Sequence, residues 1–308
     1  KVYKENKNIR LDLQKVKLKK LSLQQDVVYN KILEKINKNK YKPIFLDGVT
    51  GSGKTEVYFK LIKHFLVNKK QVLVLIPEIA LSKQWISRFH DAFKFYPLVW
   101  NSKVNQSKKK KIWQDLIEGK ISVVVGARSA IFLPFSELGI TIIDEENDIS
   151  YKQEENPIYN ARDMAVVKSK INLSAIVLVS ATPSLETYNN SKNKKYDYCK
   201  LTDRFGSANN PKVFLIDMKL EKKRLISKQT IAILKEKINK GKQILILINR
   251  RGYAPITICS ICGHKETCKK CDINLVYHKK NDKLICHHCG FSMDPKSKCI
   301  NCGESDKK

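Results

Sequence analysis

The sequence has 308 residues, of which 42% are hydrophobic, and this is enough for two domains with packed cores. No apolar run approaches the roughly 18–20 residues of a membrane-spanning helix, and residues 1–20 are rich in charge, so we expect neither a membrane span nor a secretory signal. The net charge of +29 suits a polyanionic partner, because bound phosphates release counterions, but it is equally typical of a lysine-rich protein from an AT-rich genome.

Short β-branched segments alternate with amphipathic ones along much of the chain. Residues 1–20 are lysine-rich with weak helical periodicity, and we interpret them as a basic arm or a linker remnant. In residues 21–204 the alternation predicts an α/β domain, with a parallel sheet and helices on both faces. Its expected strands include Ile44–Leu46, Val72–Ile76, Ser122–Val125, Ile140–Ile143 and Ala175–Val179.

A second unit is expected after a polar stretch rich in Asn and Lys, and we place the domain boundary near residue 205. Residues 205–258 predict the start of another α/β domain, residues 259–302 hold a Cys-rich module, and residues 303–308 form a short tail. The elements expected in this second α/β domain are strands Val213–Ile216 and Gln243–Ile248, with a helix between them that contains Ile231, Leu234 and Ile238.

A glycine-rich loop joins the first expected strand to a helix. Residues 48–55 read Gly-Val-Thr-Gly-Ser-Gly-Lys-Thr and match a P-loop, in which backbone N–H groups and a helix N-terminus face phosphates. Lys54 is expected to reach the β- and γ-phosphates of ATP, and Thr55 to bind Mg²⁺. The predicted nucleotide-binding residues of this loop are Gly48, Gly51, Ser52, Gly53, Lys54 and Thr55.

An acidic cluster follows the expected strand Ile140–Ile143. Asp144 is placed to hold Mg²⁺, and Glu145 to orient or deprotonate the attacking water, as in a Walker B segment. Acidic residues at strand ends are often only solvated caps, but downstream of a P-loop these two predict catalysis. Together with Lys54 they are the expected catalytic residues of an ATPase.

Eight of the nine cysteines form four C-x2-C pairs, a spacing typical of zinc ligands, and eight thiolates predict two tetrahedral Zn²⁺ ions. A hairpin expected over residues 273–286 would bring the second pair onto the third and leave the outer pairs to share the other ion. A sequential assignment, first four and last four, remains the alternative. Cys199 is interpreted as an ordinary thiol. The nested sets are Cys259, Cys262, Cys299 and Cys302 for one zinc, and Cys268, Cys271, Cys286 and Cys289 for the other.

Further motifs resemble the PriA family of bacterial replication-restart helicases, which belong to helicase superfamily 2. Residues 180–184, Ser-Ala-Thr-Pro-Ser, are similar to helicase motif III, and Asn147 stands where this family commonly has His. The resemblance covers nearly everything from Leu21 to Cys302. The other segments that carry it are Gly48–Tyr58, Pro77–Leu81, Gly126–Pro134, Asp144–Asp148, Ser150–Glu154, Tyr159–Asp163 and Asn249–Pro255.

The resemblance implies two RecA-like lobes, the second carrying the zinc module with nested cysteine sets. It implies an ATP-dependent helicase that moves 3′ to 5′ on single-stranded and forked DNA, and that works with other primosome proteins in the bacterial cytoplasm. Gln25 is the expected adenine contact, with a surface glutamine as the alternative. The residues expected to bind DNA or to couple it to ATP hydrolysis are Arg128, Ser129, Tyr151, Tyr159, Arg162, Ser180, Thr182, Arg250 and Arg251. The alternatives are plain packing for the two tyrosines and a surface salt bridge for Arg128.

The same resemblance implies parts that this sequence does not contain. N-terminal DNA-binding domains would precede Lys1, and helicase motifs V and VI would follow the zinc module; motif VI usually supplies an arginine finger. Three hypotheses follow: a piece of a working helicase, a truncated fragment that binds nucleotide, zinc and DNA without unwinding, or another superfamily 2 translocase, which the zinc module disfavours. We expect the 308-residue chain alone to unwind DNA poorly.

Overall fold

The computed structural model describes residues 13–39, 41–77, 83–101, 104, 106–204, 212–218, 226–247, 257–259, 261–271, 273–279, 281–295 and 297–305. The chain divides into two compact units, Lys1–Pro211 and Lys212–Lys308. The division falls a few residues beyond the boundary that the sequence predicts near residue 205.

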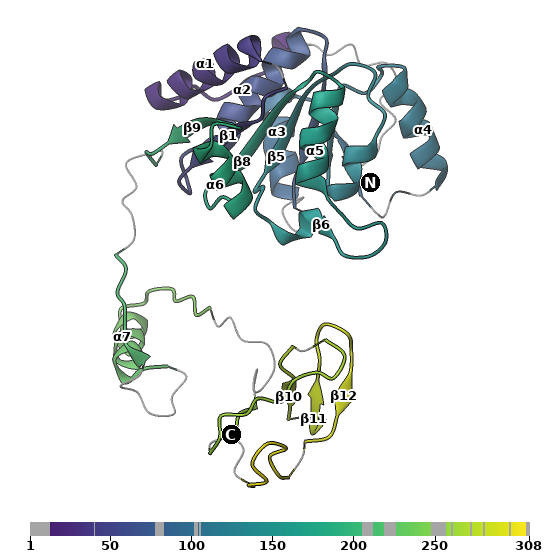
Figure 1. Ribbon diagram of the computed structural model, residues 1–308. Coiled ribbons are helices and arrows are strands. Elements are labelled where there is room, and N and C mark those ends of the chain that lie inside the picture. The colour runs from purple at the N-terminus through teal and green to yellow at the C-terminus, as the bar shows by residue number, and fades with distance from the viewer. Residues whose placement is uncertain are drawn as a thin grey trace. The chain divides into compact units, whose positions relative to one another are not determined.

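The first unit is built on a parallel sheet (Figure 1). Its strands are β1 (Ile44–Gly48), β2 (Gln71–Leu75), β3 (Leu98–Trp100), β4 (Val123–Gly126), β5 (Leu138–Asp144), β8 (Ala175–Ser180) and β9 (Asp197–Leu201). They lie in the order β3-β4-β2-β5-β8-β1-β9, and each neighbouring pair is parallel. The strands β2, β5 and β8 are buried along almost their whole length, which explains their nearly continuous apolar sequences.

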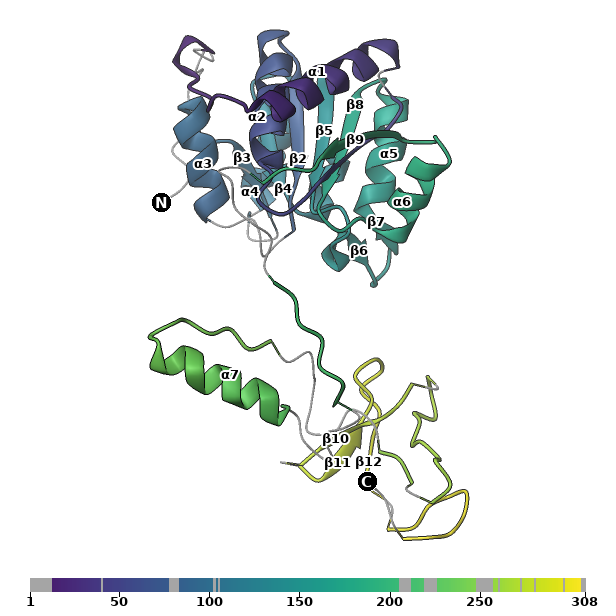
Figure 2. The same ribbon diagram turned by 90° about the vertical axis from the view of Figure 1, so that its left-hand side faces the viewer.

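Helices cover both faces of this sheet (Figures 1 and 2). The helical elements are η1 (Leu13–Lys15), α1 (Leu23–Lys38), α2 (Lys54–Val67), α3 (Lys83–Phe93), α4 (Gln106–Ile117), η2 (Arg128–Phe132), η3 (Ile149–Tyr151), α5 (Ala161–Ile171) and α6 (Leu185–Lys192). The first core cluster joins α1, α2 and α3 to strand residues such as Val72 and Val74. The second core cluster joins α4, η2 and α5 to Leu73 and Leu75, which alternate with Val72 and Val74 along β2. The predicted α/β class is confirmed. None of the described helices has the length and apolar character needed to cross a membrane.

Side-chain caps begin several of the helices around the sheet. Ser22 and Gln25 form a capping box at α1, in which each side chain accepts a hydrogen bond from the backbone N–H of the other. Asn160 caps α5, and Ser184 caps α6. The start of α2 differs, because Gly53 stands at the N-cap and no side chain caps this helix. The first N–H groups of α2 therefore need another partner.

The segment just before α1 packs against the first unit. The expected basic arm is only partly separate, because Val16 is buried in the first core cluster and the N–H of Lys17 donates to the Ala92 carbonyl at 2.8 Å. Residues 1–12 lie outside the described residues.

On the other face of the sheet, a lysine joins α5 to η2. The Lys168 ammonium of α5 donates to the carbonyl oxygens of Ile131 and Leu133, at 2.6 Å each.

The expected sheet of the second unit is not formed in the described residues. Residues 212–217 and 242–247, which cover most of the two expected strands, have no strand structure. Leu215 and Leu245 in these segments are 95% and 93% exposed. Of the expected elements only the helix is present, as α7 (Lys228–Asn239). A strand is held by hydrogen bonds to neighbouring strands, and nothing in the described residues supplies them here, so the prediction of strands is wrong for this chain.

The Cys-rich module is a set of short antiparallel segments. Strands β10 (Val276–His278), β11 (Lys283–Ile285) and β12 (Ser292–Met293) form a three-stranded sheet, and the pair β10–β11 is the hairpin that the sequence predicts. The buried core of this sheet consists of Leu275 and Leu284 with two cysteines. Two aliphatic side chains are too small a core to hold such a module together, so cross-links must contribute to its stability. A separate two-stranded ribbon, β6 (Lys152–Gln153) and β7 (Tyr159–Asn160), lies in the first unit.

Candidate ATP site and zinc clusters

The predicted ATP-binding segments meet at one edge of the sheet. β1, β8 and β5 are adjacent strands. The P-loop follows β1, the Ser180 turn follows β8, and Asp144 ends β5. In the register of the sheet, Asp47 pairs with Ser180 and Asp144 pairs with Val179. Ligands of parallel sheets bind in the crevice outside the carboxyl ends of the strands, and this is where the three segments lie together.

The P-loop backbone has the form of an anion cradle. Gly51 and Gly53 have φ values of +81° and +78°, which glycine adopts without strain. The Lys54 ammonium donates to the Gly48 carbonyl at 2.8 Å, and the hydroxyl of Ser52 is buried without a hydrogen-bond partner among the described residues. An ammonium group, a buried unsatisfied hydroxyl and an uncapped helix N-terminus together fit the phosphates of ATP.

Gln25 lies against the P-loop and not on the surface. Its amide nitrogen donates to the Ser52 carbonyl at 2.9 Å, and its amide oxygen accepts from the Ser22 N–H at 2.9 Å. A Cβ atom added to Gly53 would lie only 2.3 Å from the Gln25 nitrogen. The alternative of a surface glutamine is therefore wrong. The contact between Gln25 and adenine stays a prediction, because in this structure the amide is engaged by the protein.

Asp144 ends strand β5 and Glu145 follows it, and both lie within electrostatic reach of Lys54. Burial raises the pKa of Asp144, and a hydrogen bond from the Tyr58 hydroxyl, at 2.8 Å, opposes that rise. Burial and the neighbouring Asp144 raise the pKa of Glu145 as well. The backbone of Glu145 has a φ of +47°, a conformation that side chains other than glycine rarely adopt. A carboxylate with a raised pKa in a strained turn suits proton acceptance from water.

Asn147 joins the acidic turn to the turn after β8. Its side-chain oxygen accepts from the Ser180 hydroxyl at 2.7 Å, and its side-chain nitrogen donates to the Thr182 hydroxyl at 3.4 Å. The Thr182 N–H in turn donates to the Ser180 hydroxyl at 3.0 Å. A shift of either turn would therefore move the other, which is the physical requirement for coupling the two segments.

Glu146 forms a buried polar cluster behind the same turn. Its carboxylate accepts from the Ser184 N–H at 2.8 Å, from the Ser184 hydroxyl at 3.0 Å and from the Thr187 hydroxyl at 2.8 Å. The predicted coupling residue Arg162 completes the cluster with an ion pair of 3.3 Å to Glu146. Arg162 also donates to the Ser184 hydroxyl at 2.7 Å. The cluster fixes α5 and α6 to the acidic turn.

The two predicted tyrosines differ in their surroundings. Tyr151 is buried, and its hydroxyl donates to the Asp144 carbonyl at 2.6 Å. It therefore packs inside the fold and is not available to stack on a base, although it does contact the acidic turn. Tyr159 is half-buried and meets the exposed ring of Phe132 edge-to-face at 5.0 Å. Only Tyr159 keeps the accessibility that base stacking requires.

Two of the remaining predicted DNA contacts, Arg128 and Ser129, follow β4 at the same edge of the sheet. Arg128 donates to the Lys152 carbonyl at 3.0 Å, a contact with the β6–β7 ribbon and not a salt bridge. Ser129 is exposed, and its hydroxyl accepts from the Trp100 indole N–H at 3.1 Å. Arg250 and Arg251 lie outside the described residues.

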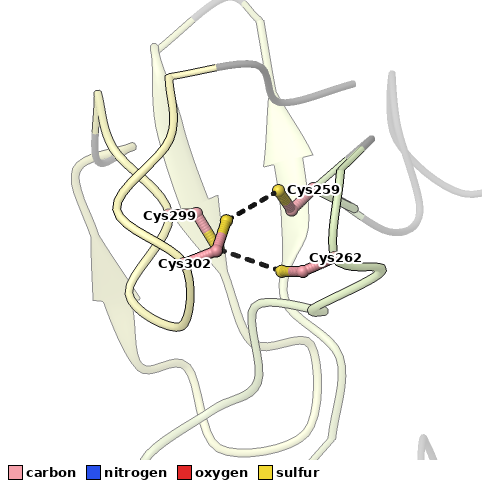
Figure 3. Close-up of side chains that lie close together, drawn as sticks. All are labelled: Cys259, Cys262, Cys299 and Cys302. Atoms are coloured by element: carbon pink, nitrogen blue, oxygen red, sulfur yellow. Dashed lines mark hydrogen bonds between the residues drawn. The ribbon is translucent and has the colours of Figure 1, made fainter.

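The eight paired cysteines form two clusters, and the grouping is nested. Cys259, Cys262, Cys299 and Cys302 form one cluster, and Cys268, Cys271, Cys286 and Cys289 form the other, with the four sulfur atoms of each set within 4.8 Å of one another. In the first cluster, contacts of 3.6 Å join Cys259 to Cys302 and Cys262 to Cys299 (Figure 3). Four thiolates around Zn²⁺, at about 2.3 Å each, lie about 3.8 Å apart. The clusters therefore fit zinc, and the sequential grouping is not found.

The ninth cysteine stands apart from both clusters. Cys199 is buried in β9, and burial raises the pKa of its thiol to about 11. A thiol that stays protonated at neutral pH is unreactive, in agreement with its interpretation as an ordinary thiol.

Sequence reasoning assigned no role to Tyr58, Trp85 or Glu146, which hold the acidic turn in place. Tyr58 follows Thr55 by three residues, a spacing that puts both on one helix face, so its proximity to the site was open to prediction. No local sequence pattern points to Trp85, because it lies on α3 and its hydrogen bond to Tyr58 on α2 joins two separate helices.

A family model described as "DEAD/DEAH box helicase" matches residues 22–191, which is more than half of the chain. The chain belongs to this helicase family. A second model, described as "PriA DNA helicase Cys-rich region (CRR) domain", matches residues 268–293 within the zinc module.

The chain is also similar, along nearly all of its length, to curated proteins named "Replication restart protein PriA". The protein from Rickettsia prowazekii is 46% identical over 97% of this chain and 47% of its own length, and that from Bacillus subtilis is 37% identical over 92% and 36%. The resemblance to the PriA family is confirmed, and the chain spans less than half the length of these relatives. The solved structure of the DUF1998 helicase MrfA shares the fold, with a TM-score of 0.51 and 16% identity over 75% of this chain and 36% of that one.

Proposed function

We propose that this chain is the ATP-binding and zinc-binding part of a DNA motor that hydrolyses ATP with Mg²⁺ and moves 3′ to 5′ along single-stranded DNA. The observation that carries this proposal is the meeting of the P-loop, the acidic turn and the Ser180 turn at three adjacent strand ends. Similarity to replication restart proteins supports a setting at stalled forks, together with other primosome proteins.

The residues divide the chemistry between them. Lys54 and the uncapped amides of α2 bind the triphosphate, while Thr55 and Asp144 hold the cation. Mg²⁺ bound there would neutralise the negative charge that develops on the phosphates. Glu145 orients the attacking water and accepts its proton.

We place DNA contact at the edge of the sheet where β4 ends. Ser129 is exposed there, Tyr159 of β7 offers an accessible ring, and Arg128 donates to the Lys152 carbonyl of β6. Such groups grip phosphates and stack on bases without reading sequence. The Asn147 bridge then links DNA-dependent movement of the Ser180 turn to the catalytic turn.

A second candidate function concerns this polypeptide by itself. Leu215 and Leu245 are exposed, and the described residues 212–218 and 241–247 contain no strand, which supports a chain without a second RecA-like sheet in these segments. The isolated chain would then bind nucleotide, zinc and DNA, and would unwind poorly.

The test is ATP hydrolysis by the full 308-residue chain, with and without single-stranded DNA, and with Lys54→Ala as the control. DNA-stimulated hydrolysis that disappears in Lys54→Ala supports the motor. Nucleotide binding without stimulated hydrolysis supports the second candidate. Failure of the wild-type chain to bind nucleotide contradicts both, and efficient unwinding of a forked substrate contradicts the second.

A further inference from the structure

A chain of hydrogen bonds runs through the first unit and ends on Asp144. The indole N–H of Trp85, on α3, donates to the hydroxyl of Tyr58, on α2, at 2.8 Å. That hydroxyl donates to Oδ2 of Asp144 at 2.8 Å. Thr55 precedes Tyr58 by three residues on the same face of α2, close enough for its side chain to interact with that hydroxyl. One hydroxyl group therefore binds the Asp144 carboxylate and lies beside Thr55, the two residues that the proposed site uses to hold the cation.

The donor and acceptor capacities of these groups determine the direction of every bond. An indole N–H only donates, and a phenol hydroxyl has one proton and two lone pairs. Tyr58 must therefore accept from Trp85 and give its single proton to Asp144. Oδ1 of Asp144 accepts from the N–H of Glu145 at 3.1 Å, so both carboxylate oxygens have fixed directions.

The surrounding packing keeps this arrangement rigid. Tyr58 is fully buried, so water does not compete for the hydrogen bonds of its hydroxyl. Trp85 is held in an aromatic cluster, stacked on Phe89 at 5.5 Å and edge-to-face with Phe59 at 5.7 Å. The Trp85 end of the hydrogen-bond chain is thus held in the core and not in solvent.

We propose that Tyr58 is a positioning residue of the cation site, held in place by Trp85, and that it sets the direction of the Asp144 carboxylate beside Thr55. The proposal rests on the proposed function at the same site. Partners that orient metal ligands typically change metal affinity by about 10- to 100-fold when they are removed. Tyr58 should act on the cation and not on the nucleotide, because its hydroxyl donates to the cation ligand Asp144 and not to the P-loop backbone.

The test separates cation binding from nucleotide binding in the full chain. Binding of Mn²⁺ is measured by electron paramagnetic resonance in the presence of a non-hydrolysable ATP analogue, and binding of the same analogue is measured separately with a chelator. Tyr58→Phe removes the hydroxyl and keeps the ring. It should weaken Mn²⁺ binding by about 10-fold and leave the chelator-resistant nucleotide affinity unchanged. Trp85→Phe should weaken Mn²⁺ binding by a smaller factor, about threefold.

Tyr198→Phe is the matched control, because Tyr198 also donates to a carboxylate, Oδ2 of Asp47 at 2.6 Å, and that carboxylate is not one of the proposed cation ligands. It should bind Mn²⁺ as the wild type does. Unchanged Mn²⁺ affinity in Tyr58→Phe, or an equal loss of both affinities, overturns this proposal and leaves the proposed function standing. If Tyr58→Phe does not fold, Trp85→Phe decides in the same way. Failure of the wild-type chain to bind Mn²⁺ with nucleotide overturns both.

Discussion

Replacing Arg162 by Met should destabilise the first unit strongly. The change keeps the apolar stem of the side chain and removes the cation that faces Glu146. The Glu146 side chain is 0% exposed and that of Arg162 is 9% exposed, so solvent cannot replace the lost charge. Breaking one partner of a buried ion pair costs about 3–5 kcal/mol. For a domain of this size, the melting temperature falls by about 2–4 °C per kcal/mol, which predicts a loss of about 6–20 °C.

The assay is urea and thermal unfolding of the full chain, followed by its helical circular dichroism. Arg88→Met is the matched control, because Arg88 pairs with Glu56 at 3.0 Å, a shorter distance than the 3.3 Å of the buried pair. The Arg88 side chain is 43% exposed, and such pairs contribute about 1 kcal/mol or less. Equal losses in the two variants would refute the reasoning, since burial and not distance is expected to decide the outcome.

Three further outcomes are expected. The double variant Cys268→Ser with Cys286→Ser should bind one zinc per chain instead of two, measured by zinc release, because the grouping is nested; loss of both ions would indicate the sequential grouping. Asn147→Ala should keep basal ATP hydrolysis and lose its stimulation by single-stranded DNA, and full stimulation would contradict the bridge to Ser180. Burial lowers the pKa of Lys168 to about 8, so between about pH 8 and pH 10.5 the unfolded chain binds more protons than the folded one. The free energy of unfolding should therefore rise with pH in this window relative to Lys168→Met, and parallel pH profiles of the two proteins would contradict the lowered pKa.

Sequence patterns predicted the parts of the site that depend on local order along the chain. The P-loop needs its glycines, lysine and threonine in consecutive positions between a strand and a helix, and the acidic turn needs a buried strand before it. Both requirements are visible in residues 44–55 and 140–145. The nested cysteine grouping followed from a hairpin of adjacent residues in the same way.

Other features depend on tertiary contacts that no local pattern records. Glu145 and Glu146 are identical neighbours in sequence, yet one faces the site and the other is buried with Arg162 because the chain turns at Glu145 with a positive φ. The expected strand Val213–Ile216 has a good β propensity, but a strand also requires neighbours, and in the described residues Leu215 has none.

The nested arrangement of the two cysteine clusters has a consequence for the order of assembly. The outer cluster joins Cys262 to Cys299, 37 residues apart, and the inner one joins Cys268 to Cys289, 21 residues apart and inside that span. Once the inner cluster is closed, its 21 residues no longer contribute to the outer loop, and subtracting them from 37 leaves 16. Loop-closure entropy scales with the logarithm of loop length, so the outer loop then closes at a cost lower by about 0.7 kcal/mol. The inner ion should accordingly bind first and raise the affinity of the outer site about threefold, so that the module assembles from its centre outward.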